Sequence, residues 1–85
     1  MIITQLINNA DAHANAQGQN IAITIDYAIA TAARDRVALG QALTYQEKEQ
    51  AYCAIRRLYE RLGLDFDRVL AFYRDEAWRC GNAVS

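Results

Sequence analysis

The sequence predicts an all-α protein, a small bundle of about four short helices, and three observations support this fold class. The chain has 85 residues, which is enough for a single helical domain over 1–85 and too few for a second. It contains no proline to interrupt a helix, and 16 alanines that favour one. Its glycines lie at positions 18, 40, 63 and 81, where each can end a helix. The intervals between them predict helices over about residues 3–17, 20–39, 44–62 and 65–80.

The helix over 3–17 is defined by a narrow apolar stripe. The stripe consists of Ile3, Leu6, Ile7, Ala10 and Ala14. The opposite face carries asparagines and an aspartate, which are weak helix formers, so this helix depends on packing. The only histidine, His13, lies at the edge of the stripe, where we expect a structural role.

Two interpretations fit the segment 20–39. Large apolar residues occupy every odd position from 21 to 29, which is typical of a strand, whereas the alanine-rich continuation to residue 39 favours a helix. We expect the helix and keep the strand over 21–29 as the alternative. A helix here would have two apolar faces, one of Ile21, Ile25, Ile29 and Ala32, the other of Ile23, Tyr27, Ala30 and Val37. The second face predicts either a central position in the bundle or self-association as a homodimer.

The segments 44–62 and 65–80 have the clearest helical signals. Thr44 and Glu47 form a capping box, and Asp65 is a good N-cap for the last helix. Apolar stripes follow, made of Tyr52, Ile55, Leu58, Tyr59 and Leu62, and of Phe66, Val69, Leu70, Tyr73, Ala77 and Cys80. With Gly63 between them, the two segments predict an antiparallel hairpin with interlocking aromatic side chains. This hairpin is the part of the fold that the sequence defines best.

Composition excludes several functional classes. Nine basic and ten acidic side chains give a net charge of −1, so we do not favour nucleic-acid binding by bulk positive charge. No apolar run is long enough for a membrane span, and two cysteines without a leader pattern predict the cytoplasm. The only serine is Ser85, and glycine-rich phosphate loops and zinc-ligand spacings are absent from the sequence. We therefore expect no enzymatic activity, no metal and no other cofactor.

The candidate binding residues lie on the polar sides of the last two predicted helices. Trp78 follows Arg74 by one turn, and an exposed tryptophan beside an arginine is typical of a protein-binding hot spot. Cys53, Arg56 and Arg57 share the polar face of the preceding helix. Neighbouring cations favour a thiolate at Cys53, so a thiol-based redox sensor is one alternative, and a small covered residue is the other.

The turn at Leu62-Gly63-Leu64-Asp65 resembles that of a helix-turn-helix DNA-binding unit, over about 25 residues. The apolar positions that such a unit needs are Leu58, Leu62, Leu64, Val69 and Phe72. Tyr59 stands where a small residue is usual, and the last helix opens with two carboxylates that repel phosphates. Phosphate contacts would come from Arg68, Arg74 and Arg79.

The function that the sequence favours is a non-catalytic protein-binding module. Such a module would act as an adaptor or inhibitor that occupies a surface on a larger protein, as small accessory proteins of bacteria, phages or plasmids do. The alternative is a dimeric, helix-turn-helix-like DNA-binding regulator. No family resemblance extends over the whole chain.

Overall fold

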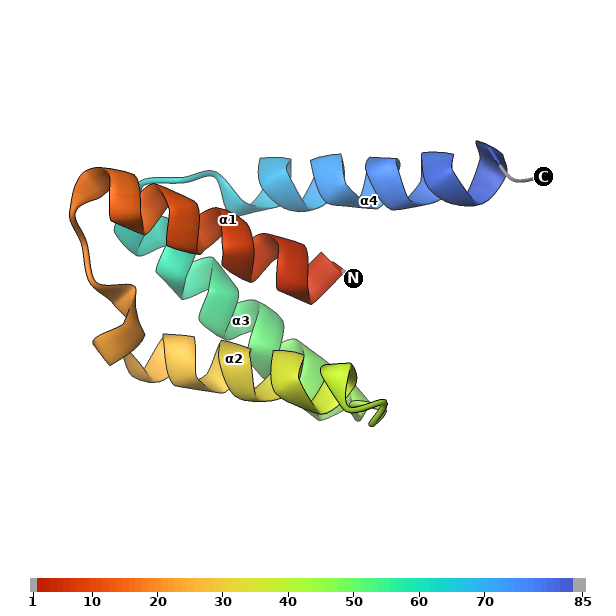
Figure 1. The fold of residues 1–85 in the computed structure, drawn as a ribbon, viewed down its shortest axis with the longest axis horizontal. Helices are drawn as coiled ribbons and strands as arrows, with labels where there is room; N and C mark the ends of the chain where they lie inside the picture. The colour runs from red at the N-terminus through yellow and green to blue at the C-terminus, as the bar shows by residue number, and fades with distance from the viewer. Residues whose placement is uncertain (1, 84–85) are drawn as a thin grey trace.

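The computed structural model describes the backbone of residues 2–83 and the side chains of residues 2–75. The elements are α1 (Ile2–Gln17), the single 3₁₀ turn η1 (Ile21–Ile23), α2 (Ile25–Ala38), α3 (Tyr45–Leu62) and α4 (Phe66–Ala83). Successive α-helices run back and forth, as Figure 1 shows. The predicted all-α bundle is thus confirmed, and the alternative of a strand over 21–29 is wrong. Within the described backbone, none of the helices has both the length and the apolar character needed to span a bilayer.

The predicted helix over 20–39 begins later than expected, because Thr24 divides the segment. Thr24 is extended (φ −87°, ψ 150°), and its Oγ1 donates to the carbonyl of Ile21 at 2.7 Å. The same oxygen accepts from the backbone N–H of Tyr27 at 3.1 Å and so caps α2. Ile21 is buried before this break, whereas Ile23 and Ile25 are 81% and 78% exposed. The isoleucines at positions 21, 23 and 25 therefore do not form one face of a strand or of a single helix, because the chain breaks at Thr24 between two helical segments.

The core lies where α1, α2 and α3 meet. Its largest fully buried side chains are Tyr59, Leu6, Ile7, Ile55 and Leu58. Alanines are also fully buried there, namely Ala10, Ala30, Ala51 and Ala54, and small side chains let the helices approach closely. α2 and α3 share the most extensive contact of any pair of described helices.

The turn between α3 and α4 is formed as the sequence predicts. Gly63 is left-handed (φ +73°), its N–H donates to Glu60 O at 3.1 Å, and the N–H of Leu64 donates to Tyr59 O at 2.8 Å. These are the paired bonds of a Schellman cap. The side chain of Asp65 then accepts from the N–H of Arg68 at 3.2 Å. Local hydrogen bonding thus reverses the chain between the two helices.

The α3–α4 hairpin is packed mainly near its turn. The rings of Tyr59 and Phe66 meet edge to face, with centroids 5.4 Å apart. Val69, Leu70 and Tyr73 continue this contact on the side of α4 that faces the core. Figure 1 shows the later half of α4 running past the ends of the other helices. α4 is therefore anchored through its first two turns.

Candidate functional site

Arg56, one of the residues predicted to bind a partner, connects α3 to α4. Its Nη2 and Nη1 donate to the two carboxylate oxygens of Asp67 at 2.9 and 3.3 Å. The guanidinium also lies 4.8 Å from the centre of the Phe66 ring. The hydrogen bonds to Asp67, and then its negative charge, raise the pKa of Arg56. This arginine is thus already engaged within the chain.

Arg57 makes a similar connection between α3 and α2. Its Nε donates to Asp26 Oδ1 at 2.7 Å, and this bond and the charge of Asp26 raise the pKa of Arg57. Asp26 and Asp67 both lie in the first turn of their helices, where the helix dipole favours a carboxylate. The two arginines therefore hold the starts of α2 and α4 against α3.

Cys53 is exposed on the outer side of α3. It lines a shallow hollow of about 440 Å³ together with Gln46, Glu49, Gln50 and Arg57. Within the described side chains nothing covers the thiol, so the interpretation as a small covered residue does not hold for this single chain. The described residues also contain no group of three or more His, Cys, Asp or Glu side chains that could hold a metal ion.

The predicted contact residues on α4 are only partly described. Arg74 is exposed. Trp78, Arg79 and Cys80 lie outside the residues whose side chains are described. The structure therefore leaves the proposed pairing of Trp78 with Arg74 as a prediction.

The four residues expected to form a self-association face do not lie on one exposed surface. Ala30 is 0% exposed in the core, and Tyr27 packs on the core and donates to Asp11 Oδ2 at 3.3 Å. Burial, and then the charge of Asp11, raises the pKa of Tyr27. Val37 is half-buried, and only Ile23 is open to solvent. The expectation is corrected because the break at Thr24 separates Ile23 from the helix that carries the other three.

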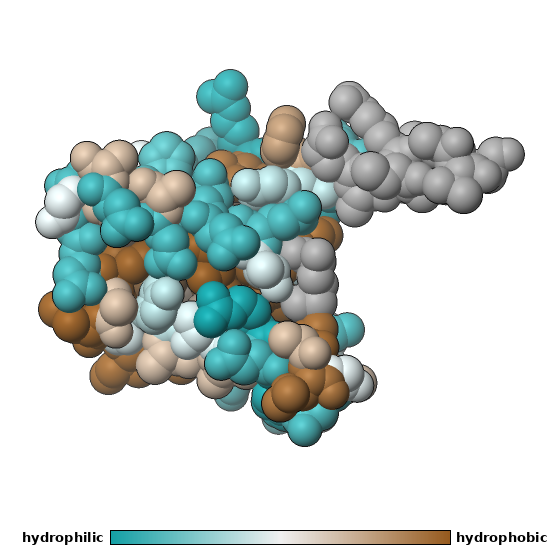
Figure 2. All heavy atoms as spheres, viewed as in Figure 1, coloured by the Kyte–Doolittle hydropathy of each residue, from teal (hydrophilic) through white to brown (hydrophobic). Residues whose placement is uncertain are grey.

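Exposed apolar side chains, Ile23 among them, gather in two places on the surface. Figure 2 shows hydrophobic residues at the left end, over η1 and the start of α2, and a second group over the end of α2. The first group contains Ile23 and Ile25, and the second contains Leu39. These are the parts of the surface where self-association would bury apolar area.

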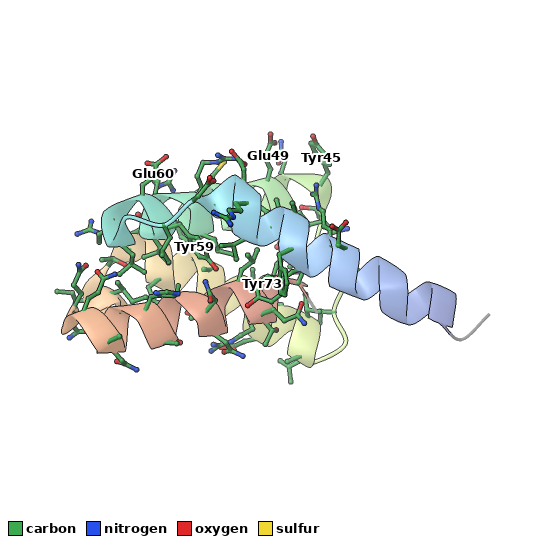
Figure 3. All side chains as sticks on the ribbon, turned by 90° about the horizontal axis from the view of Figure 1, so that it is seen from above. Tyr45, Glu49, Tyr59, Glu60 and Tyr73 are labelled. Atoms are coloured by element: carbon green, nitrogen blue, oxygen red, sulfur yellow. The ribbon has the colours of Figure 1, made fainter. Side chains whose placement is uncertain are left out.

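The phenol of Tyr59 is a structural group. Figure 3 shows Tyr59 and Tyr73 turned toward α1. The Tyr59 hydroxyl donates to Leu6 O at 2.7 Å and accepts from Asn9 Nδ2 at 3.2 Å. Burial raises the pKa of Tyr59 to about 12. Because both hydrogen bonds are made within the bundle, this hydroxyl stabilises the packing of α1 on α3.

One side of α4 borders a hollow of about 270 Å³, here called the α4 hollow. It is lined by Asn9, Arg68, Val69, Phe72 and Tyr73. Phe72 is 58% exposed, and its ring meets that of Tyr73 edge to face at 5.5 Å. A helix-turn-helix unit needs an apolar residue at the position of Phe72. The exposure of the Phe72 ring is a departure from that pattern.

No known protein family, curated protein or solved structure matches this chain. Function is therefore inferred from the geometry of the chain alone.

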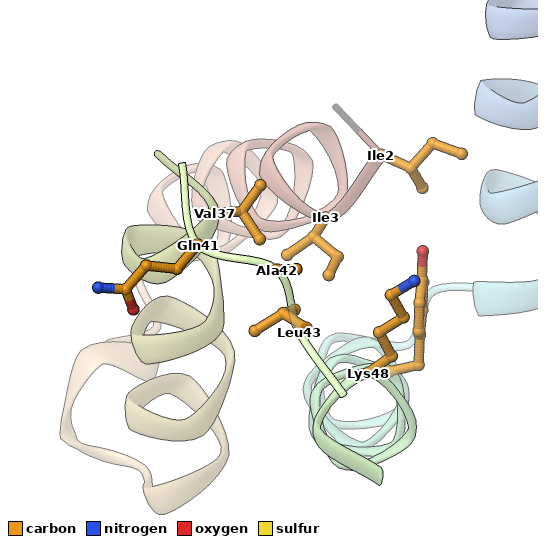
Figure 4. A pocket seen from close by; sticks show the side chains of 8 residues that line it. Ile2, Ile3, Val37, Gln41, Ala42, Leu43 and Lys48 are labelled. Atoms are coloured by element: carbon orange, nitrogen blue, oxygen red, sulfur yellow. The ribbon is translucent and has the colours of Figure 1, made fainter. Parts of the chain in front are cut away.

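A second hollow, here called the apolar pocket, has a volume of about 530 Å³. It is lined by Ile2, Ile3, Val37, Gln41, Ala42, Leu43, Lys48 and Tyr52, from α1, α2, α3 and the loop between α2 and α3 (Figure 4). Sequence analysis missed this site, although Ile3, Val37 and Tyr52 were each identified as apolar-stripe residues. No periodic pattern places the loop at 39–44 against the start of α1, and that contact forms the pocket.

Proposed function

We propose that the chain is a non-catalytic protein-binding module that occupies a surface on a larger protein, with α4 as the main contact element. The observation that carries this proposal is the exposed Phe72 beside Arg68 in the α4 hollow. Aromatic residues, phenylalanine among them, and arginine are enriched at protein interfaces. Asn9 adds a polar group at the edge of the same hollow.

The arrangement of α4 supports the same function. The backbone of its later half runs past the ends of the other helices (Figure 1). Arg74 is exposed on this helix, and Trp78 follows it by one helical turn in the sequence. Both residues stay in the proposed contact surface. Arg56 and Arg57 leave it, because their guanidinium groups bind Asp67 and Asp26. Cys53 leaves it as well, because it lines a separate hollow on α3.

Capture experiments with matched variants test the proposal. The tagged chain would be used to isolate partners from its source cells after nuclease treatment, as wild type, Phe72→Ala and Tyr45→Ala. A hot-spot side chain contributes about 2 kcal/mol or more, so Phe72→Ala is expected to weaken binding of the captured protein about 30-fold. Tyr45→Ala removes another exposed aromatic side chain, at the start of α3 and outside the α4 hollow, and should leave binding unchanged. Equal losses for the two variants would contradict the proposal.

The alternative function, DNA binding by α4, has one supporting observation. Arg68 and Arg74 are both exposed on this helix and available to phosphates. Binding through phosphates weakens steeply as salt rises, so mobility shifts at two salt concentrations separate this function from protein binding. Capture that is lost on nuclease treatment would also favour the DNA-binding function.

Self-association is proposed separately, through the exposed Ile23 and the neighbouring Ile25. Sedimentation of wild type and of Ile23→Asp tests it. A homodimer that uses this patch should dissociate in the variant, because a buried unpaired carboxylate is costly.

A further inference from the structure

The apolar pocket has the size and lining of a small-molecule site. Its volume of about 530 Å³ lies within the range of about 300–1,000 Å³ that is typical of ligand pockets. Figure 4 shows Ile3, Val37 and Leu43 directed into the space between α1, α2 and α3. The side chain of Gln41 points away from this space in the same view. The interior is therefore formed mainly by hydrocarbon side chains.

Two polar groups of α3 stand at the edge of the pocket. Lys48 is the only lysine of the chain, and Figure 4 shows its side chain extending from α3 toward the start of α1. Tyr52 lies one helical turn later, so its phenol is on the same side of α3 as Lys48. A cation and a hydroxyl thus lie beside an apolar interior.

The carboxylate of Glu47, the residue before Lys48, is engaged elsewhere. Glu47 pairs with Arg36, and its Oε1 accepts from the N–H of Thr44 at 3.0 Å. Lys48 makes no ion pair with any described side chain. The charge at the edge of the pocket is therefore available to an anion from solution.

We propose that the apolar pocket binds a small monocarboxylate with an unbranched hydrocarbon tail, of the medium-chain fatty-acid class. The tail would lie among Ile3, Val37 and Leu43, and the carboxylate would bind the ammonium of Lys48 and the hydroxyl of Tyr52. An acid with an apolar tail matches both the hydrocarbon interior and the cation at the edge. The inference is independent of the proposed protein-binding function, because no residue of the α4 hollow lines this pocket.

A titration followed by NMR of the labelled full-length chain tests the proposal with three ligands of equal tail length. These are decanoate, decanol and decyltrimethylammonium, each kept below its critical micelle concentration. Decanoate should saturate, with the largest shifts at Ile3, Val37 and Leu43. The cationic ligand should bind at least about fourfold more weakly than decanoate, because a repulsion by Lys48 replaces an attraction of similar size. From hexanoate to decanoate, affinity should rise by up to about fourfold for each methylene that the pocket buries.

Variants separate the charge from the apolar contact. Lys48→Gln should weaken decanoate binding about two- to fivefold, the range for a solvent-exposed charge pair, and should leave decanol binding unchanged. Arg61→Gln removes an exposed cation at the other end of the same helix and serves as the matched control. Ala42→Phe fills the pocket from an exposed loop position without removing a core side chain, and it should abolish binding of both ligands.

Three results would overturn the proposal. The first is the absence of saturable shifts with decanoate. The second is shifts centred on Ile23, Ile25 or Phe72, which would show adsorption to exposed apolar side chains. The third is equal affinity of Lys48→Gln, Arg61→Gln and wild type for decanoate.

Discussion

The buried hydroxyl of Tyr59 makes the stability of the fold depend on pH in the alkaline range. Its pKa is raised from 10.0 to about 12 by burial. Below about pH 10 the phenol is neutral in both the folded and the unfolded chain, so its full contribution to stability is present. As the pH rises from about 10 to 12, the unfolded chain ionises first, and this contribution is lost.

The size of the loss follows from the shift of about two pKa units. Each unit corresponds to about 1.4 kcal/mol, so the complete effect is about 2.7 kcal/mol, and about 1.4 kcal/mol of it is lost by about pH 11. Tyr59→Phe removes the titrating group together with its hydrogen bonds to Leu6 and Asn9, and each of these two bonds contributes about 1 kcal/mol. At about pH 8 the variant should therefore be less stable than wild type by about 2 kcal/mol, and at about pH 11 this difference should shrink to about 0.6 kcal/mol.

The assay is urea unfolding followed by circular dichroism at both pH values. Tyr45→Phe is the matched control because Tyr45 is exposed, and its pH dependence should equal that of wild type. Comparing variants at the same pH removes the effect of every other group that titrates in this range. A difference between wild type and Tyr59→Phe that is the same at both pH values would refute the buried-phenol explanation.

Three further predictions concern the helix ends and the exposed thiol. Thr44→Ala removes half of the capping box of α3 and should lower the free energy of unfolding by about 1 kcal/mol, measured by urea unfolding. Gly63→Ala places a Cβ in open space but on a left-handed backbone, so we expect a loss of about 1 kcal/mol by the same assay; an unchanged midpoint would contradict the strain argument. Cys53 should react with a thiol reagent in the folded chain, because its side chain is exposed. Mass spectrometry of wild type and of Cys53→Ser shows which part of the labelling occurs at Cys53. A fully protected Cys53 would contradict the described exposure.

Features fixed by neighbouring residues were predicted well from the sequence. The helix expected over 44–62 is observed as Tyr45–Leu62, because Thr44, Glu47 and Gly63 determine its ends through local hydrogen bonds. The error at 20–39 is also local. Thr24 is a favourable N-cap residue, but the apolar pattern around it is continuous and predicts one helix. The two apolar faces that this pattern predicts both extend across the break at Thr24, so both are misplaced.

The candidate sites were less predictable, because they depend on distant contacts. The bonds from Arg56 to Asp67 and from Arg57 to Asp26 join residues 11 and 31 positions apart, and periodicity alone places both arginines on a solvated face. The α4 hollow similarly requires Asn9 of α1. Helical phase predicts which side of a helix is polar, but it does not predict which other helix covers that side.

The way in which α4 is held connects the fold to the proposed function. Its described contacts with the bundle lie in the first two turns: Phe66 in the core, Asp67 bound to Arg56, and Tyr73 packed against the core. These contacts set the direction in which the helix leaves the bundle, and they leave Arg68, Phe72 and Arg74 exposed on it. Phe72 lies on the solvent side of this anchored region, so its position is determined before any partner binds. A preorganised aromatic side chain loses little conformational entropy on binding, which favours affinity from a small contact area.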